Sequence, residues 1–247
     1  MTQHEKAQFR EICNTERSLS QSQSGIGTYN EKLLHRIIKR FVYANEGNYE
    51  IPIGGYVADL IVGDRIFEIQ TSSLRPLADK LRYYLEHTDL NVTVIHPIIA
   101  NKTLIRMDKE SGEIIRARRS PLRGKICNAL PELFYIRELF SDPRLSVCIL
   151  LIDAEEHRYS ERMRYRKAGA YDSILFPTDL IDIGRLSSTD DLKSFLPSSP
   201  SFSAKEYSQY IGIKGRDVYS ALNFLCYVGV LKKEKEGNKY IYHNENF

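Results

Sequence analysis

The chain of 247 residues lacks any run of about 20 apolar residues, so nothing in it predicts a membrane span. Its polar first residues, MTQHEKAQFREICNTERSLSQSQSG, lack the apolar core of a signal peptide, and we expect a cytoplasmic protein with no membrane partner. The four cysteines are widely spaced and form no CxxC pair. This spacing argues against a zinc site and a disulfide framework, and predicts free, mostly buried thiols.

The chain also lacks a large excess of charge of one sign, because 35 Lys and Arg residues are balanced by 32 Asp and Glu and leave a formal net charge of +3. This excess is too small to require a nucleic-acid partner. The basic residues are unevenly distributed, however, and crowd the segments 116–125 and 158–167. A basic cluster is usually a solvated face, but two clusters in a chain with an acidic patch make nucleic acid a serious candidate.

The acidic patch lies in residues 57–71, which read VADLIVGDRIFEIQT. The Gly-Asp pair at 63–64 predicts a two-residue hairpin turn, whose register makes the numbers of paired residues sum to 127. Asp59 then faces Glu68, and Gln70 shares the face of Glu68. Two carboxylates and an amide predict a site for Mg²⁺, with Mn²⁺ as an alternative ion. An edge hairpin with merely solvated acids is the competing interpretation.

The surrounding pattern predicts an α/β (α+β) fold, a mixed sheet flanked by helices. Apolar residues at three- and four-residue spacing predict a helix beginning near Thr28. Its Glu31 could close a capping box with Thr28 or reach the Asp59/Glu68 patch, and both alternatives stay open. Three strands within 49–71, a helix over 74–87 and a buried strand over 91–99 follow, listed here in chain order.

This series of elements resembles the PD-(D/E)XK nuclease core of Holliday-junction resolvases and type II restriction enzymes, over residues 27–100. The resemblance implies a restriction-endonuclease-like fold and a hydrolase that cuts DNA phosphodiester bonds. It also implies that Asp59, Glu68 and the helix residue Glu31 bind one or two magnesium ions. The order of elements carries this resemblance more than the short motifs do.

The chain departs from the family at Gln70, where lysine is commonest. Without that lysine, the cation that orients water and steadies the scissile phosphate must come from elsewhere. Lys80 on the following helix is the predicted replacement, and Lys102 is the second choice. For Lys80, a lysine that merely snorkels from a helix edge is the alternative.

The middle segment predicts a second hairpin, with strands at 104–107 and 113–116, and an arginine-rich continuation. We expect this arm to contact DNA phosphates through Arg116, Arg118, Arg119 and Arg123. Residues 126–140 predict one helix and 145–159 a buried strand. The acids that end this strand, Asp153, Glu155 and Glu156, are expected to pair with nearby arginines rather than form a second metal site.

Residues 187–245 resemble a winged helix-turn-helix module. A capping box at Ser203 and Glu206, a helix over 216–228 and strands around 237–238 carry this resemblance. It assigns the DNA groove to Lys214, Arg216, Tyr219 and Asn223, and the wing to Lys235 and Lys239. A tyrosine-rich protein-docking or dimerisation unit is the alternative.

We therefore predict an N-terminal arm (1–26), a PD-(D/E)XK nuclease-like domain (27–186) and a small C-terminal winged-helix domain (187–247). The first hypothesis is a magnesium-dependent DNA endonuclease, for which a homodimer would suit cutting of both strands. The second is a catalytically inactive nuclease fold that binds DNA or regulates. The third is an interaction scaffold without nucleic acid, in which the basic clusters are solvated surface.

Overall fold

A computed structural model describes residues 1–21, 29–108, 111–160 and 172–244. The chain forms two compact units. The first comprises Met1–Tyr49, Pro97–Lys125 and Leu150–Ile183, and the second comprises Glu50–His96, Ile126–Ile149 and Gly184–Phe247. This division passes through three long strands, whereas the boundaries expected after residues 26 and 186 follow changes in composition. The expected domain boundaries stay a prediction.

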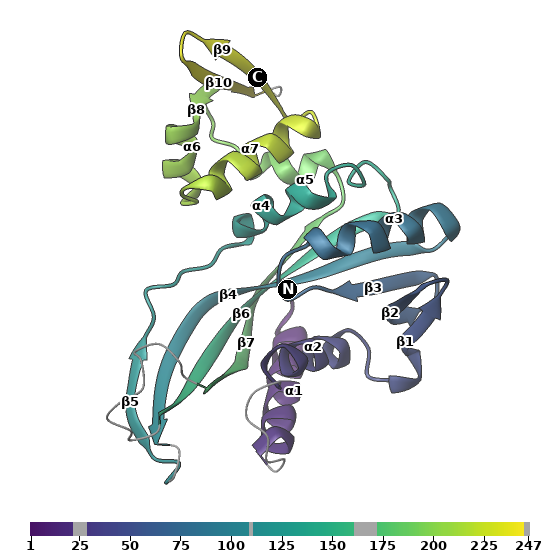
Figure 1. The fold of residues 1–247 in the computed structure, drawn as a ribbon, viewed down its shortest axis with the longest axis vertical. Helices are drawn as coiled ribbons and strands as arrows, with labels where there is room; N and C mark the ends of the chain where they lie inside the picture. Colours follow the sequence, from purple (N-terminus) through teal and green to yellow (C-terminus); the bar gives the residue numbers. More distant parts are fainter. Residues whose placement is uncertain (22–28, 109–110, 161–171, 245–247) are drawn as a thin grey trace. The chain divides into compact units, whose positions relative to one another are not determined.

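A mixed sheet has the strand order β1-β2-β3-β4-β6-β7, and β5 pairs with β4 (Figure 1). Its strands are β1 (Tyr49–Ile53), β2 (Tyr56–Val62), β3 (Arg65–Ile69), β4 (Asn91–Asp108), β5 (Ile114–Arg119), β6 (Leu145–Ser160) and β7 (Asp172–Leu186). The pairs β2/β3 and β4/β5 are antiparallel, and β3/β4 is parallel. A mixed sheet flanked by helices is therefore confirmed.

The first unit begins with two packed helices, α1 (Gln3–Gln21) and α2 (Tyr29–Val42). The N-terminal segment, predicted as an arm over 1–26, contains the helix α1, which is 19 residues long. Its buried face explains the length: the rings of Phe9 and Phe41 meet edge to face at 5.2 Å. Glu16 is fully buried and pairs with Arg36 and Arg40 of α2.

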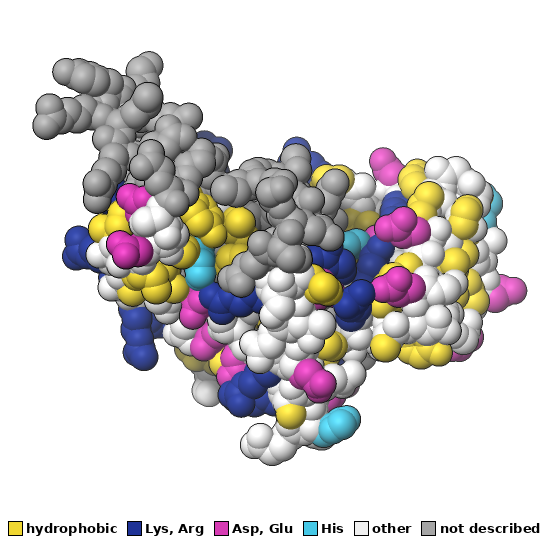
Figure 2. All heavy atoms as spheres, turned by 90° about the horizontal axis from the view of Figure 1, so that it is seen from below, with side chains coloured by type: hydrophobic (Ala, Val, Ile, Leu, Met, Phe, Trp, Pro, Cys, Tyr) yellow, Lys and Arg dark blue, Asp and Glu magenta, His cyan; other side chains and the backbone are white. Residues whose placement is uncertain are grey.

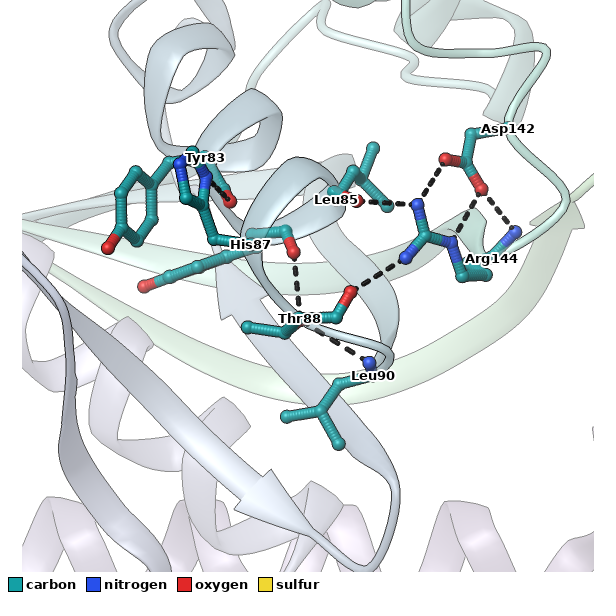
Figure 3. Close-up of polar contacts among 8 residues, drawn as sticks. Tyr83, Leu85, His87, Thr88, Leu90, Asp142 and Arg144 are labelled. Atoms are coloured by element: carbon teal, nitrogen blue, oxygen red, sulfur yellow. Dashed lines mark hydrogen bonds and ion pairs between the residues drawn. The ribbon is translucent and has the colours of Figure 1, made fainter.

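In the second unit, a 3-10 turn, η2 (Arg75–Leu77), leads into α3 (Ala78–His87), which confirms the helix expected over 74–87. Arg144 holds the end of α3 by donating to the carbonyl oxygens of Leu85 (2.6 Å) and Thr88 (2.7 Å) (Figure 3). The carboxylate of Asp142 accepts from the same guanidinium group at 2.8 Å. These bonds satisfy carbonyls that a helix end otherwise leaves without a partner.

The prediction of a single helix over 126–140 is wrong. The segment consists of η3 (Ile126–Ala129), α4 (Leu130–Leu133) and η4 (Phe134–Ile136). Pro131 explains the break, because in a continuous helix it would lack the backbone donor and clash with the carbonyl of Cys127. Two strands also differ from expectation: β4 is one strand through Pro97 to Asp108, and β7 was not expected.

The C-terminal elements follow the expected order. They are α5 (Thr189–Lys193), β8 (Ser201–Ser203), α6 (Ala204–Ile211), α7 (Arg216–Tyr227), β9 (Leu231–Glu236) and β10 (Lys239–Asn244). The capping box is confirmed, since Ser203 N donates to Glu206 Oε2 at 2.7 Å and Glu206 N to Ser203 Oγ at 3.3 Å. The strands form a small sheet in the order β8-β10-β9. The ring of Phe224 on α7 packs against Phe140 at 5.2 Å. Within the described residues, no helix has the length and apolarity that crossing a membrane would require.

Candidate functional site

The hairpin of β2 and β3 has the register that its turn predicts. Leu60 pairs with Phe67, and Val62 with Arg65, so paired numbers sum to 127. Gly63 at the turn has a φ of +59°, which a side chain would disfavour. Asp59 and Glu68 are the next residues beyond the Leu60/Phe67 pair, and the negative charge of Asp59 acts on Glu68. There the main-chain amide of Ile69 donates to Asp59 Oδ2 at 2.8 Å.

Glu68 is the buried centre of this site, with a relative exposure of 2%. Two side chains of α3 contact its carboxylate. Lys80 Nζ lies 2.6 Å from Glu68 Oε2, and the hydroxyl of Tyr84 donates to Oε1 at 3.2 Å. Lys80 therefore makes a largely buried ion pair, with 18% of its side chain exposed, instead of extending into water. The expected approach of Lys80 to the acidic hairpin is observed, and its catalytic role stays a prediction.

The electrostatics of Glu68 follow from this setting. Burial, and then the negative charge of Asp59, raise the pKa of Glu68 to about 7. The charge and hydrogen bond of Lys80 and the hydrogen bond of Tyr84 act in the opposite direction. A carboxylic acid that titrates near neutral pH beside a second carboxylate is a favourable place for an added cation. Asp59 and Glu68 thus offer oxygen donors of the kind that a hard cation prefers, and binding of the cation stays a prediction.

Gln70 supports the loop after β3. Its side-chain amide donates to the carbonyl oxygen of Ser73 at 2.7 Å and to Ser72 Oγ at 3.3 Å. The Gln70 carbonyl oxygen lies 2.7 Å from Nδ1 of His96, a residue whose burial lowers its pKa. Gln70 is therefore fixed by the loop through its amide group, and its place in a metal site stays a prediction.

The sequence patterns did not identify two residues that support this site, Tyr84 and Glu132. Tyr84 lies within the helix predicted over 74–87, but its hydroxyl contact with Glu68 has no local sequence signal. Glu132 accepts from Ser73 Oγ and from the amide of Leu74, both at 2.9 Å, and so anchors the start of the α3 segment. Its position 58 residues from Leu74 makes that contact invisible to sequence patterns.

The other members of the expected metal set are placed as follows. Glu31 belongs to α2, but its side chain lies outside the described residues. Lys102, the second choice for the missing lysine, instead pairs with Glu156 at 2.5 Å. Over the described parts of the chain, no group of three His, Cys, Asp or Glu side chains is arranged to hold a metal ion.

The hairpin of β4 and β5 carries exposed arginines, as expected. Arg116 lies directly opposite Arg106, Arg118 opposite Leu104, and Arg119 opposite Thr103. The first two arginines line one hollow, and Arg119 and Arg123 line another. Among the coloured side chains of Figure 2, Lys and Arg lie beside acidic side chains.

Two acids of β6, Glu155 and Glu156, pair with cations as expected, whereas Asp153 accepts from the main-chain amide (3.1 Å) and side-chain amide (2.8 Å) of Asn101. The strand continues past these acids to Ser160. Glu155 contacts Arg17 at 2.5 Å and His157 at 3.1 Å, while Glu156 contacts Arg158 at 2.6 Å. Most of the second basic cluster, Arg162, Arg164, Arg166 and Lys167, lies outside the described residues.

The residues expected to meet DNA from the C-terminal elements are exposed. They are Lys214, Arg216, Tyr219, Asn223, Lys235 and Lys239. Tyr219 on α7 has 56% of its surface exposed, and on the β9/β10 hairpin Lys233 Nζ lies 4.0 Å from the ring centre of Tyr240. Exposure leaves these side chains available to a partner, and DNA contact stays a prediction.

Comparisons with known proteins give a family and a distant relative. Residues 32–182 match the family described as "Domain of unknown function (DUF8091)". A protein of Treponema pallidum (strain Nichols), named "Uncharacterized protein", is 30% identical over 146 residues. These residues cover 58% of this chain and 57% of the relative. No solved structure matches.

Proposed function

The chain belongs to the DUF8091 family, and we propose that it is a magnesium-dependent DNA endonuclease with a PD-(D/E)XK-like core. One observation carries the proposal. A buried carboxylate on β3, Glu68, has a pKa of about 7, contacts Lys80 of the following helix and feels the negative charge of Asp59 on β2. Two acids on a hairpin and a lysine on the next helix match what cutting a phosphodiester bond requires: anionic ligands and a fixed cation.

Asp59 and Glu68 would hold the ion, Mg²⁺ or in its place Mn²⁺, and Glu31 is the proposed third ligand. When bound, Mg²⁺ lowers the pKa of a coordinated water and stabilises negative charge on the phosphate. Tyr84 keeps Oε1 of Glu68 oriented through its hydroxyl group. Lys80 would supply the positive charge that steadies the scissile phosphate. In PD-(D/E)XK nucleases, a lysine at the position of Gln70 has this role.

The proposed DNA contacts come from two parts of the chain. In the C-terminal part, an order of elements typical of a winged helix supports groove contacts from α7 and phosphate contacts from the β9/β10 hairpin. In the first unit, the exposed arginines of β5 support a phosphate-contacting arm. A homodimer would bring together the two sites needed to cut both strands of a duplex.

An inactive DNA-binding or regulatory protein is the second candidate, and Gln70 favours it. Its side chain provides no cation, and its amide group is held by Ser72 and Ser73. A scaffold without nucleic acid would require all the exposed basic side chains to be solvated surface. The salt dependence of DNA affinity separates this last alternative from the other two, because release of counterions makes phosphate binding fall steeply with salt.

Plasmid nicking in Mg²⁺ tests the proposal with three proteins. The native chain should nick, and the Asp59→Ala/Glu68→Ala variant should not. The matched control, Asp79→Ala/Glu86→Ala, removes two exposed acids from α3 and should nick like the native chain. Nicking by the first variant, at the native rate, would overturn the proposal. DNA binding without nicking by the native chain would favour the inactive DNA-binding protein.

A further inference from the structure

Because side chains alternate along a strand, the arginines of the β4/β5 hairpin lie on two different faces of the sheet. On the β4/β5 hairpin, Arg106 and Leu104 lie directly opposite Arg116 and Arg118. Directly opposed residues of an antiparallel pair share a face, so these four side chains point to the same side. Arg158 of β6, the other neighbour of β4, lines the same hollow. Four guanidinium groups from three strands thus converge on one place.

Acidic side chains compensate this charge only in part. Glu156 of β6 lies on the same face and is shared by Lys102 (2.5 Å) and Arg158 (2.6 Å). Burial raises the pKa of Glu156, but the hydrogen bonds from Arg158 and Lys102 lower it by more than burial raises it. The pKa therefore lies below its ordinary value, and the group stays ionised. Among the described residues 102–108, 114–119 and 154–158, strand alternation places on this face five cationic side chains and two carboxylates, Glu156 and Asp108.

The hairpin itself sets two like charges against each other. Directly opposed like charges, here Arg106 and Arg116, repel across a strand pair, and an anion bound between them removes the repulsion. A guanidinium group donates two parallel hydrogen bonds to a phosphate, a geometry that lysine does not offer. Arg106, Arg116 and Arg118 are exposed, so an anion reaches them without a change in the fold.

We propose that Arg106, Arg116, Arg118 and Arg158 form a binding site for a backbone phosphate of DNA. The choice of DNA as the source of the phosphate rests on the proposed function, whereas the preference for phosphate follows from the arginines alone. Of the four arginines that the sequence predicts to contact DNA phosphates, this site includes only Arg116 and Arg118. Arg119 and Arg123 line a different hollow together with the acids Asp153 and Glu155, which weaken its attraction for an anion.

The test measures binding of a fluorescent DNA duplex to the full chain in EDTA, over a series of salt concentrations. Arg116→Gln/Arg118→Gln removes two charges from the proposed site. Arg119→Gln/Arg123→Gln removes the same charge from the same segment but from the other hollow. Thermal melting of each variant checks that it is folded. Vesicles of phosphatidylglycerol and inorganic phosphate serve as alternative sources of the anion.

The slope of log affinity against log salt should fall by about 0.9 in the first variant, since the proposed site holds one phosphate and each phosphate contact contributes about 0.9. The control should change it by less than half as much. Equal loss in both folded variants, or binding of vesicles or free phosphate but not of DNA, would overturn the inference. Because EDTA removes the metal ion, this binding result is separate from the test of the proposed activity. DNA binding through this site by a chain that does not nick would refute only the nuclease. Nicking by the native chain, with DNA binding unchanged in Arg116→Gln/Arg118→Gln, would refute only the phosphate site.

Discussion

Lys80 Nζ lies 2.6 Å from Oε2 of Glu68, and this contact joins a helix side chain to a nearly fully buried carboxylate of the neighbouring strand. Burying a carboxylate without a partner would be costly, and Lys80 stabilises the ionised form of Glu68. The negative charge of Asp59 acts on the pKa of Glu68 in the opposite direction. The site therefore holds one more acid than lysine, an imbalance that an added cation relieves.

The first prediction concerns Lys80. Replacing it in Lys80→Met removes the ammonium group that lowers the pKa of Glu68, so Glu68 should titrate above pH 7. Nicking should fall about 100-fold or more, because removal of one preorganised electrostatic contact commonly costs that much. A plasmid assay between pH 6 and 9 measures both effects. Arg82→Met, which removes an exposed cation from the same helix, should leave activity unchanged, and native activity in Lys80→Met would exclude the assigned role.

The second prediction is a pH dependence of stability. Glu68 has a pKa of about 7 in the folded chain against 4.5 ordinarily, so the folded state retains a proton that the unfolded state loses. Its contribution to the free energy of unfolding is therefore fully present below pH 4.5 and is lost as pH rises through about 7. The shift corresponds to about 3 kcal/mol.

Urea unfolding at several pH values checks this contribution. Glu68→Gln cannot lose a proton, and its free energy of unfolding should lack this fall between pH 4.5 and 7. The exposed control Glu86→Gln should follow the native profile. The same pH profile in Glu68→Gln and the native chain would show that Glu68 is not the titrating group.

The third prediction concerns the fully buried Glu16, which joins α1 to α2 through Arg36 and Arg40. Glu16→Gln removes its charge and should lower the free energy of unfolding by about 2 kcal/mol. This is less than for a fully buried pair, because both arginines are partly exposed and regain water. Urea unfolding measures the change, and the exposed control Glu11→Gln should lie close to native. A loss no greater than that of the control would mean that the pair contributes no stability.

The fourth prediction concerns Arg144, whose guanidinium group donates to Leu85, Thr88 and Asp142 (Figure 3). Arg144→Lys keeps the charge but loses the planar fork, and should lower the urea midpoint because the end of α3 loses its partners. Arg82→Lys alters only exposed ion pairs of α3 and should have a smaller effect. A midpoint for Arg144→Lys as high as that of Arg82→Lys would contradict this role.

Local chemistry decided which features were predictable from the sequence. The turn at Gly63 pins the β2/β3 register, and with it the approach of Asp59 to Glu68, because one residue of slip would reverse every side chain. The capping box at Ser203 and Glu206 is equally local. By contrast, the buried face of α1 depends on contacts such as Phe9 with Phe41, which no short pattern reveals.

Two further differences have the same origin. Pro131 breaks a segment whose apolar spacing alone predicts one helix, so a single residue outweighed the pattern. The hydroxyl of Tyr84 and the carboxylate of Glu132 take their roles from residues distant in the chain or on another element. The core of the site was therefore predictable, and its supporting contacts were not.

Titration calorimetry with Mg²⁺ tests the central claim most directly. The native chain and the exposed control Asp79→Ala/Glu86→Ala should bind Mg²⁺, more tightly at pH 8 than at pH 6 because Glu68 must lose its proton. The Asp59→Ala/Glu68→Ala variant should show no binding at either pH. Equal binding of Mg²⁺ by this variant and the native chain would contradict the assignment of the β2/β3 hairpin as the metal site.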